Sequence, residues 1–86
     1  MSTQPSDEGA LVFREVDGEV LALDQRSHQV HQLNGTASFI WRAYRHSSSL
    51  QDTAAAFAAA FDVDEETARS DVADTVQRLR LLNLVR

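Results

Sequence analysis

The chain has 86 residues, a net charge of -5 and no cysteine. A chain of this length holds one hydrophobic core and no second domain, and without cysteine it has no disulfide, thiolate metal site or cysteine nucleophile. An acidic domain is repelled by phosphate groups, so nucleic acids and anionic membranes are poor partners.

The first residues are polar and include the only proline of the chain. This composition predicts a disordered tail over residues 1–10 ahead of one domain over residues 11–86. The N-terminus lacks the basic start and apolar run of a signal peptide, and no later stretch approaches membrane-spanning length. We therefore expect a cytoplasmic protein that does not enter membranes.

Two strands are predicted at the start of the domain, over residues 11–16 and 19–24. Between them stands Asp17-Gly18, which suits a two-residue hairpin turn because both positions tolerate positive φ. Alternation along the second strand places Val20 and Ala22 on one face and the intervening leucines on the other.

A third strand is predicted after a turn at residues 25–27. It is polar for a strand, which favours an edge of the sheet over the centre. No later strand in the sequence is available to pair with it, so its free backbone groups could accept a peptide by β-augmentation. The residues of this predicted edge are His28, Gln29, Val30, His31, Gln32 and Leu33.

Three helices are predicted next, because the apolar spacing changes from two residues to about 3.6. Asn34, Ser49 and Asp64 are favourable N-caps, and Asp52 predicts a capping box with Ser49. The predicted core stripes are Ala37, Ile40, Trp41 and Tyr44, then Leu50, Ala54, Phe57 and Phe61, then Ala68, Val72, Val76 and Leu79 in a helix that runs to about Asn83. The order predicts an α+β fold, a three-stranded antiparallel sheet followed by a three-helix bundle in a winged-helix-like arrangement.

No group of residues has the pattern of a catalytic or metal site. His28 and His31 on a strand point to opposite faces, which favours surface histidines over a zinc site. Residues 47–49 are serines without the glycine-flanked turn of a nucleophile elbow. The carboxylates of residues 62–74 occupy a helix start and its exposed face, as solvated side chains do. We expect a binding protein with no enzymatic activity, cofactor or metal.

One run of residues resembles a known family. Leu33-Asn34-Gly35-Thr36-Ala37, followed by Ile40-Trp41, resembles the L-N-x-T-A/G-x-x-I-W signature of the PqqD family, the peptide-recognition domains of pathways that modify ribosomally made peptides. The resemblance extends over residues 11–86. Two positions depart from it: Asn83 stands where glycine is usual, and His31 where an aromatic residue is common.

The resemblance implies a non-catalytic chaperone that binds the leader part of a precursor peptide. It would present this peptide to a modifying enzyme, typically a radical S-adenosylmethionine (SAM) protein, as in pyrroloquinoline quinone biosynthesis. In such domains the leader adds as a strand beside the third strand and lies against the third helix. The flank of that helix beside its core stripe mixes charge, hydroxyl and apolar contact, and the resemblance favours a groove there over a merely solvated flank. Its residues are Asp71, Thr75, Arg78 and Leu82.

Three alternatives stay open at this point. One is a winged-helix regulator that binds DNA, against which stand the acidity, the absence of lysine, and Asp71 and Asp74 on the third helix. Another is an adaptor that only dimerises. The last is a recognition domain of a lasso-peptide or other modified-peptide pathway, because the residues do not distinguish one peptide pathway from another.

Overall fold

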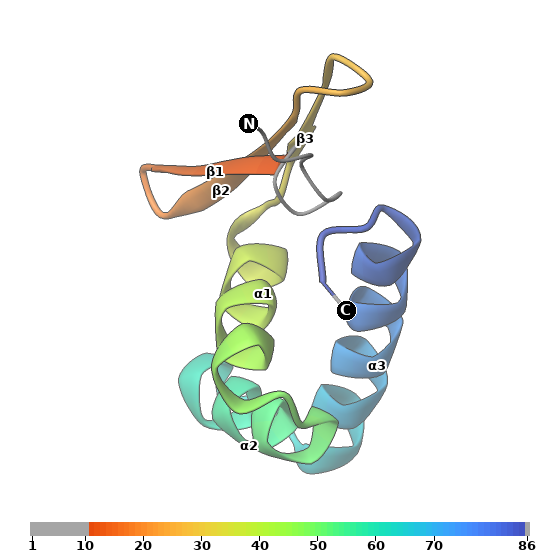
Figure 1. Cartoon of the computed structure of the whole chain (residues 1–86). Coiled ribbons are helices and arrows are strands. Elements are labelled where there is room, and N and C mark those ends of the chain that lie inside the picture. Colours follow the sequence, from red (N-terminus) through yellow and green to blue (C-terminus); the bar gives the residue numbers. More distant parts are fainter. Residues whose placement is uncertain (1–10, 86) are drawn as a thin grey trace.

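The computed structural model describes residues 11–85, so the predicted tail over residues 1–10 lies outside the described part. The elements in chain order are β1 (Leu11–Val16), β2 (Glu19–Asp24), β3 (Gln29–Gln32), α1 (Gly35–Ser47), α2 (Leu50–Phe61) and α3 (Glu65–Leu81). The strands form an antiparallel sheet in the order β1-β2-β3, and the helices gather on one side of it (Figure 1). The predicted α+β fold is confirmed.

The first hairpin has the predicted turn. Asp17 and Gly18 have φ values of 53° and 83°, the left-handed region that a tight hairpin turn requires. The face assignment of β2 is also confirmed, because Val20 and Ala22 are only 2% and 0% exposed. Val20 and Ala22 therefore belong to the inner face of the sheet, which packs against the helices.

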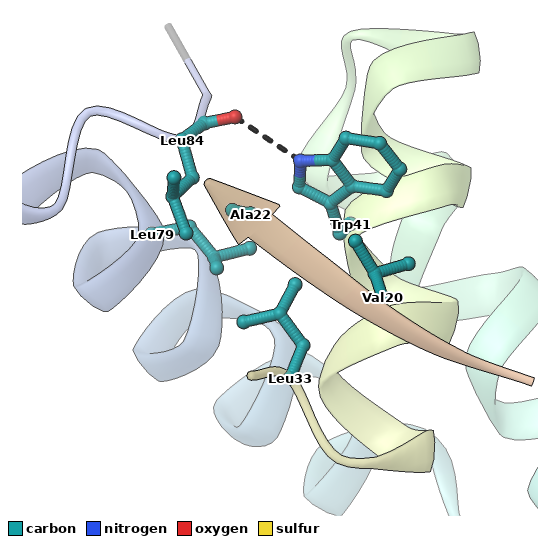
Figure 2. Close-up of a cluster of buried hydrophobic side chains, with 6 residues drawn as sticks. All are labelled: Val20, Ala22, Leu33, Trp41, Leu79 and Leu84. Carbon is teal, nitrogen blue, oxygen red and sulfur yellow. Dashed lines mark hydrogen bonds between the residues drawn. The ribbon is translucent and has the colours of Figure 1, made fainter. Parts of the chain in front are cut away.

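Two hydrophobic clusters hold the domain together. The cluster under the sheet joins the inner face of β2 to α1 and the end of α3, and in it the indole Nε1 of Trp41 donates to the Leu84 carbonyl at 3.1 Å (Figure 2). Its buried members are Val20, Ala22, Leu33, Trp41, Leu79 and Leu84. The second cluster lies between the helices and consists of Ile40, Ala54, Phe57, Ala68, Val72 and Val76.

All three predicted helix caps are present. Asn34, Ser49 and Asp64 accept hydrogen bonds from amides in the first turns of α1, α2 and α3. The capping box is only half formed: Ser49 accepts from the Asp52 amide, but its own amide donates to Ser47 Oγ at 3.2 Å. The Ser47 hydroxyl therefore accepts the hydrogen bond from the Ser49 amide that was predicted for the Asp52 carboxylate.

The core stripe of α2 is shorter than predicted. Ala54 and Phe57 are buried, whereas Leu50 and Phe61 are each 42% exposed. These two residues begin and end α2. The ring of Phe61 still packs against those of Phe39 and Phe57, with centroids 5.3 and 4.7 Å apart. In α3, all four residues of the predicted stripe are buried. Within residues 11–85 there is no helix with the length and apolarity needed to cross a membrane.

The C-terminal end of α3 forms a Schellman motif. The helix ends at Leu81, two residues before the predicted end, and Asn83 follows with a φ of 62°. The Leu84 amide donates to the Leu79 carbonyl at 2.8 Å, and the Asn83 amide to the Arg80 carbonyl at 3.0 Å. Asn83 thus occupies the left-handed position for which glycine is preferred, and the motif directs Leu84 into the core.

We expect Asn83→Ala to lower the free energy of unfolding by about 1 kcal/mol, because a Cβ disfavours the left-handed conformation and alanine lacks the polar side chain that tolerates it. Asn83→Gly should leave that free energy unchanged or raise it slightly. Urea unfolding of the two variants measures the difference. If alanine and glycine were equally stable at this position, the left-handed conformation would not limit stability.

Candidate functional site

The outer edge of β3 is free within the described part of the chain, as the sequence predicted. The Leu33 amide donates to the Val20 carbonyl at 2.8 Å, and His31 pairs with Ala22. In an antiparallel ladder, consecutive residues turn their backbone groups alternately towards the partner strand and away from it. The amides and carbonyls of Val30 and Gln32 therefore point away from β2, to the free edge.

The side chains of β3 alternate between the two faces of the sheet. His31 pairs with buried Ala22, so it shares the inner face and is half-buried. Val30 pairs with Leu23 on the outer face and is 63% exposed. A strand added to this edge would therefore place its own side chains alternately beside His31, towards the helices, and beside Val30, away from them.

The predicted strand over His28–Leu33 is two residues too long. His28 lies in the turn before β3 with a φ of 59°, and Leu33 follows β3 and is 6% exposed in the core. The turn is longer than predicted because Asp24 Oδ1 accepts from the amides of Arg26 and Ser27, at 3.0 and 3.3 Å, which draws the chain around before β3 begins. The edge available for pairing is therefore Gln29–Gln32.

Asp24 is the titratable group with a shifted pKa next to this edge. Desolvation raises the pKa of the Asp24 carboxyl. Hydrogen bonds from Ser27 and Arg26, together with the charge of nearby His31, lower this pKa by more than desolvation raises it. The net pKa is below the usual value, so the carboxylate stays ionised at neutral pH and keeps the turn closed. Among residues 11–85, no three potential metal-ligating side chains of histidine, cysteine, aspartate or glutamate lie together.

The predicted residues of α3 lie in one row. Asp71, Thr75, Arg78 and Leu82 follow one another at helical spacing, and all are exposed except Thr75, which is half-buried. The row runs beside the buried stripe of α3. Figure 2 shows Leu79 of that stripe beside Leu33, just after β3.

Leu79 and Leu33 belong to the same buried cluster, which brings the end of α3 towards the end of β3. Arg78 and Leu82 are therefore the row residues closest along the helix to the strand. Asp71 lies eight residues before Leu79, or about 12 Å along the helix axis at 1.5 Å per residue.

One exposed apolar side chain was missed by the sequence analysis. Leu81 is 76% exposed and lies next to Leu82, which is 41% exposed. Both leucines fall outside the buried stripe of α3, which continues through Leu79. Their position off this stripe is the sequence signal that could have identified them as exposed apolar residues. Exposed leucines at the end of a helix give α3 an apolar end for contact with another molecule.

Comparisons with known proteins show one family and two solved structures that are similar to this chain. The family model described as "Coenzyme PQQ synthesis protein D (PqqD)" matches residues 19–85. A solved structure of TbiB1 in complex with the TbiA(beta) leader peptide is similar, with 26% identity, a TM-score of 0.78, and coverage of 95% of this chain and 93% of that chain. A lasso peptide synthetase B1 complexed with its leader peptide is 28% identical, with a TM-score of 0.74 and coverage of 83% and 84%. No curated protein matches the chain.

Proposed function

The chain belongs to the PqqD family, and from this membership we propose that it is a non-catalytic chaperone that binds the leader segment of a ribosomally made precursor peptide. It presents the leader to a peptide-modifying enzyme. In pyrroloquinoline quinone biosynthesis this enzyme is of the radical SAM type. The observation that carries the proposal is the likeness to two solved structures, each a complex with a leader peptide. The role places the chain in the cytoplasm, where precursor peptides are made.

Strand addition at β3 explains how such a peptide would be held. Val30 and Gln32 offer two amides and two carbonyls at the free edge, which suits a peptide in extended conformation. Four hydrogen bonds at about 1 kcal/mol net each fall short of the roughly 8 kcal/mol that corresponds to a dissociation constant of 1 µM. Side-chain contacts with His31 and with the α3 row must therefore supply the remaining affinity and the selectivity.

The other edge of the sheet, β1, is less suited to a peptide. The ring of Phe13 lies 4.7 Å from that of Trp41, and the Arg45 guanidinium lies over both rings. Glu15 forms a 2.8 Å ion pair with Arg42 of α1. Side chains of α1 thus already contact the side chains of β1. The row on α3, by contrast, has exposed side chains that a peptide could contact.

We expect Arg78→Glu to weaken leader binding about tenfold or more, because a hydrogen bond to a charged group contributes about 1.5–3 kcal/mol when its partner is desolvated. The matched control is Arg69→Glu, which makes the same charge change at an exposed position on another side of α3. We expect the control to change the affinity less than twofold, and neither variant to lower the unfolding temperature. Equal effects at both positions would mean that only the net charge matters and would remove Arg78 from the site.

The direct test of the proposal is calorimetry with the leader peptide of the precursor encoded beside this chain's gene. We expect a dissociation constant of 1 µM or tighter, about -8 kcal/mol. Absence of heat, together with absence of competition against a labelled leader at high peptide concentration, would contradict the proposal.

A second candidate function is leader recognition in a lasso-peptide pathway. The similar structure of a lasso peptide synthetase B1 in complex with its leader favours it. The neighbouring genes separate the two pathways, because they show which precursor and which class of modifying enzyme accompany this chain. A DNA-binding role has less support, since Asp71 and Asp74 are exposed on α3 and would repel a phosphate backbone.

A further inference from the structure

The outer face of the sheet carries five apolar side chains beside the polar ones of Arg14, Glu19 and Gln32, and none of the described helices covers it. Val12, Leu23 and Val30 stand opposite one another across the three strands, and Leu21 and Val16 continue the face towards the first hairpin. Val16 and Val30 are 52% and 63% exposed. We call these five residues the outer apolar face. Val12, Leu21 and Leu23 between them are half-buried. Apolar surface that is only partly covered within one domain is suited to protein contact.

A shallow pocket of about 240 Å³ lies at the hairpin end of this face. Its walls combine apolar side chains with two carboxylates and one amide, from Val16, Leu21, Asp17, Glu19 and Gln32. Gln32 Nε2 donates to Glu19 Oε1 at 3.0 Å, and this hydrogen bond orients the carboxylate. A long cationic side chain fits such walls, because its methylene stem can lie on the apolar residues while its charged head meets the carboxylates.

We propose that the outer apolar face is the docking surface for the modifying enzyme, and that this enzyme inserts an arginine or lysine into the pocket beside Asp17 and Glu19. The proposal rests on the proposed function for the identity of the partner. Charge supports it, since the chain carries a net charge of -5 and two of its carboxylates line the pocket. Val30 belongs both to this face and to the free edge of β3. An enzyme docked on the face would therefore lie next to the added peptide strand.

A second copy of this chain is the competing occupant, because it could offer Arg14. This residue lies on the outer face opposite Leu21. However, two identical acidic domains repel each other, whereas a basic partner is attracted. Sedimentation velocity of the whole chain shows whether a second copy of the chain occupies the face. We expect a monomer at tens of micromolar, and a dimer that Arg14→Ser abolishes would overturn the proposal.

The test titrates the modifying enzyme encoded beside the precursor gene against the whole chain, without leader. We expect Val16→Asp to weaken enzyme binding at least tenfold, because it places a charge in the apolar contact. The matched control is Leu50→Asp, an apolar residue of α2 with 42% exposure, which should change the affinity less than twofold. Val16→Asp should also keep the native leader affinity. Its unfolding temperature should fall slightly, because the new carboxylate stands opposite Glu19 across the hairpin. A loss of leader affinity as large as the loss of enzyme affinity would mean that the variant disturbs the whole domain, which would overturn the proposal.

The charge contribution is tested with the double variant Asp17→Asn, Glu19→Gln. Asparagine tolerates the positive φ at position 17, so the hairpin turn is kept. We expect enzyme binding by the native chain to weaken severalfold between 50 and 300 mM salt, and binding by the double variant to depend much less on salt. Equal enzyme affinity for the native chain and Val16→Asp would overturn the docking surface. Enzyme binding without leader binding would instead contradict the proposed function and leave the docking surface standing.

Discussion

A proline at Val30 is expected to abolish leader binding while the domain stays folded. Proline removes the backbone N–H, and its ring occupies the space beside the strand where a partner strand would pair. The ladder turns the Val30 amide away from β2, so no hydrogen bond within the sheet is lost. We expect the affinity for the leader to fall at least thirtyfold, which corresponds to about 2 kcal/mol or more.

The matched control is Gln29→Pro, one residue earlier. Gln29 pairs with Asp24, and the alternation of the ladder directs its amide towards β2. Proline at this position should therefore destabilise the sheet itself. Circular dichroism and thermal unfolding separate the two outcomes. If Val30→Pro folded normally and bound the leader with native affinity, the peptide would not pair with β3.

The largest loss of stability among conservative changes is expected for Ser38→Ala. Ser38 is 0% exposed, and its hydroxyl stands between two strand ends. Ser38 Oγ accepts from the Val20 amide at 2.8 Å and donates to the Leu33 carbonyl at 3.0 Å. Through these two bonds, α1 fixes the point at which β3 separates from β2. Alanine would leave a buried donor and a buried acceptor without partners, each at a cost of about 1–3 kcal/mol.

We expect Ser38→Ala to lower the free energy of unfolding by about 3 kcal/mol in total, a large share of the 5–15 kcal/mol that is usual for a domain. For a chain of this size, the unfolding temperature should fall by roughly 10 °C or more. Ser70→Ala, an exposed change on α3, is the control and should leave the free energy of unfolding unchanged or raise it by about 0.5 kcal/mol, because alanine favours the helix. A loss below about 1 kcal/mol for Ser38→Ala would mean that water or a small shift satisfies both backbone groups.

Local rules predicted most of the fold correctly. The Asp17-Gly18 turn, the three N-caps and the α3 stripe depend on side-chain chemistry or spacing within a few residues, and each was found as predicted. The position of Asn83 is also local, because asparagine tolerates the left-handed conformation that ends α3.

Features that depend on tertiary contacts could not be predicted in this way. The burial of Ser38 between Val20 and Leu33 joins segments that are 18 and 5 residues away, and nothing near Ser38 in the sequence distinguishes it from the exposed serines. The start of β3 shifted because the Asp24 carboxylate closes a longer turn, which places His28 outside the strand. Packing also places Leu79 and Leu33 in one buried cluster. This placement determines which residues of the α3 row lie nearer to β3.

The central claim is that the leader pairs with β3 and contacts α3, and an NMR titration of the ¹⁵N-labelled chain with the leader peptide tests it most directly. We expect the largest amide shifts at Val30 and Gln32, with further shifts over Gln29–Gln32 and along residues 71–82. The shifts should be smaller at Asp71 than at Arg78 and Leu82. Shifts centred on the first hairpin or on α2, with β3 unchanged, would contradict the account.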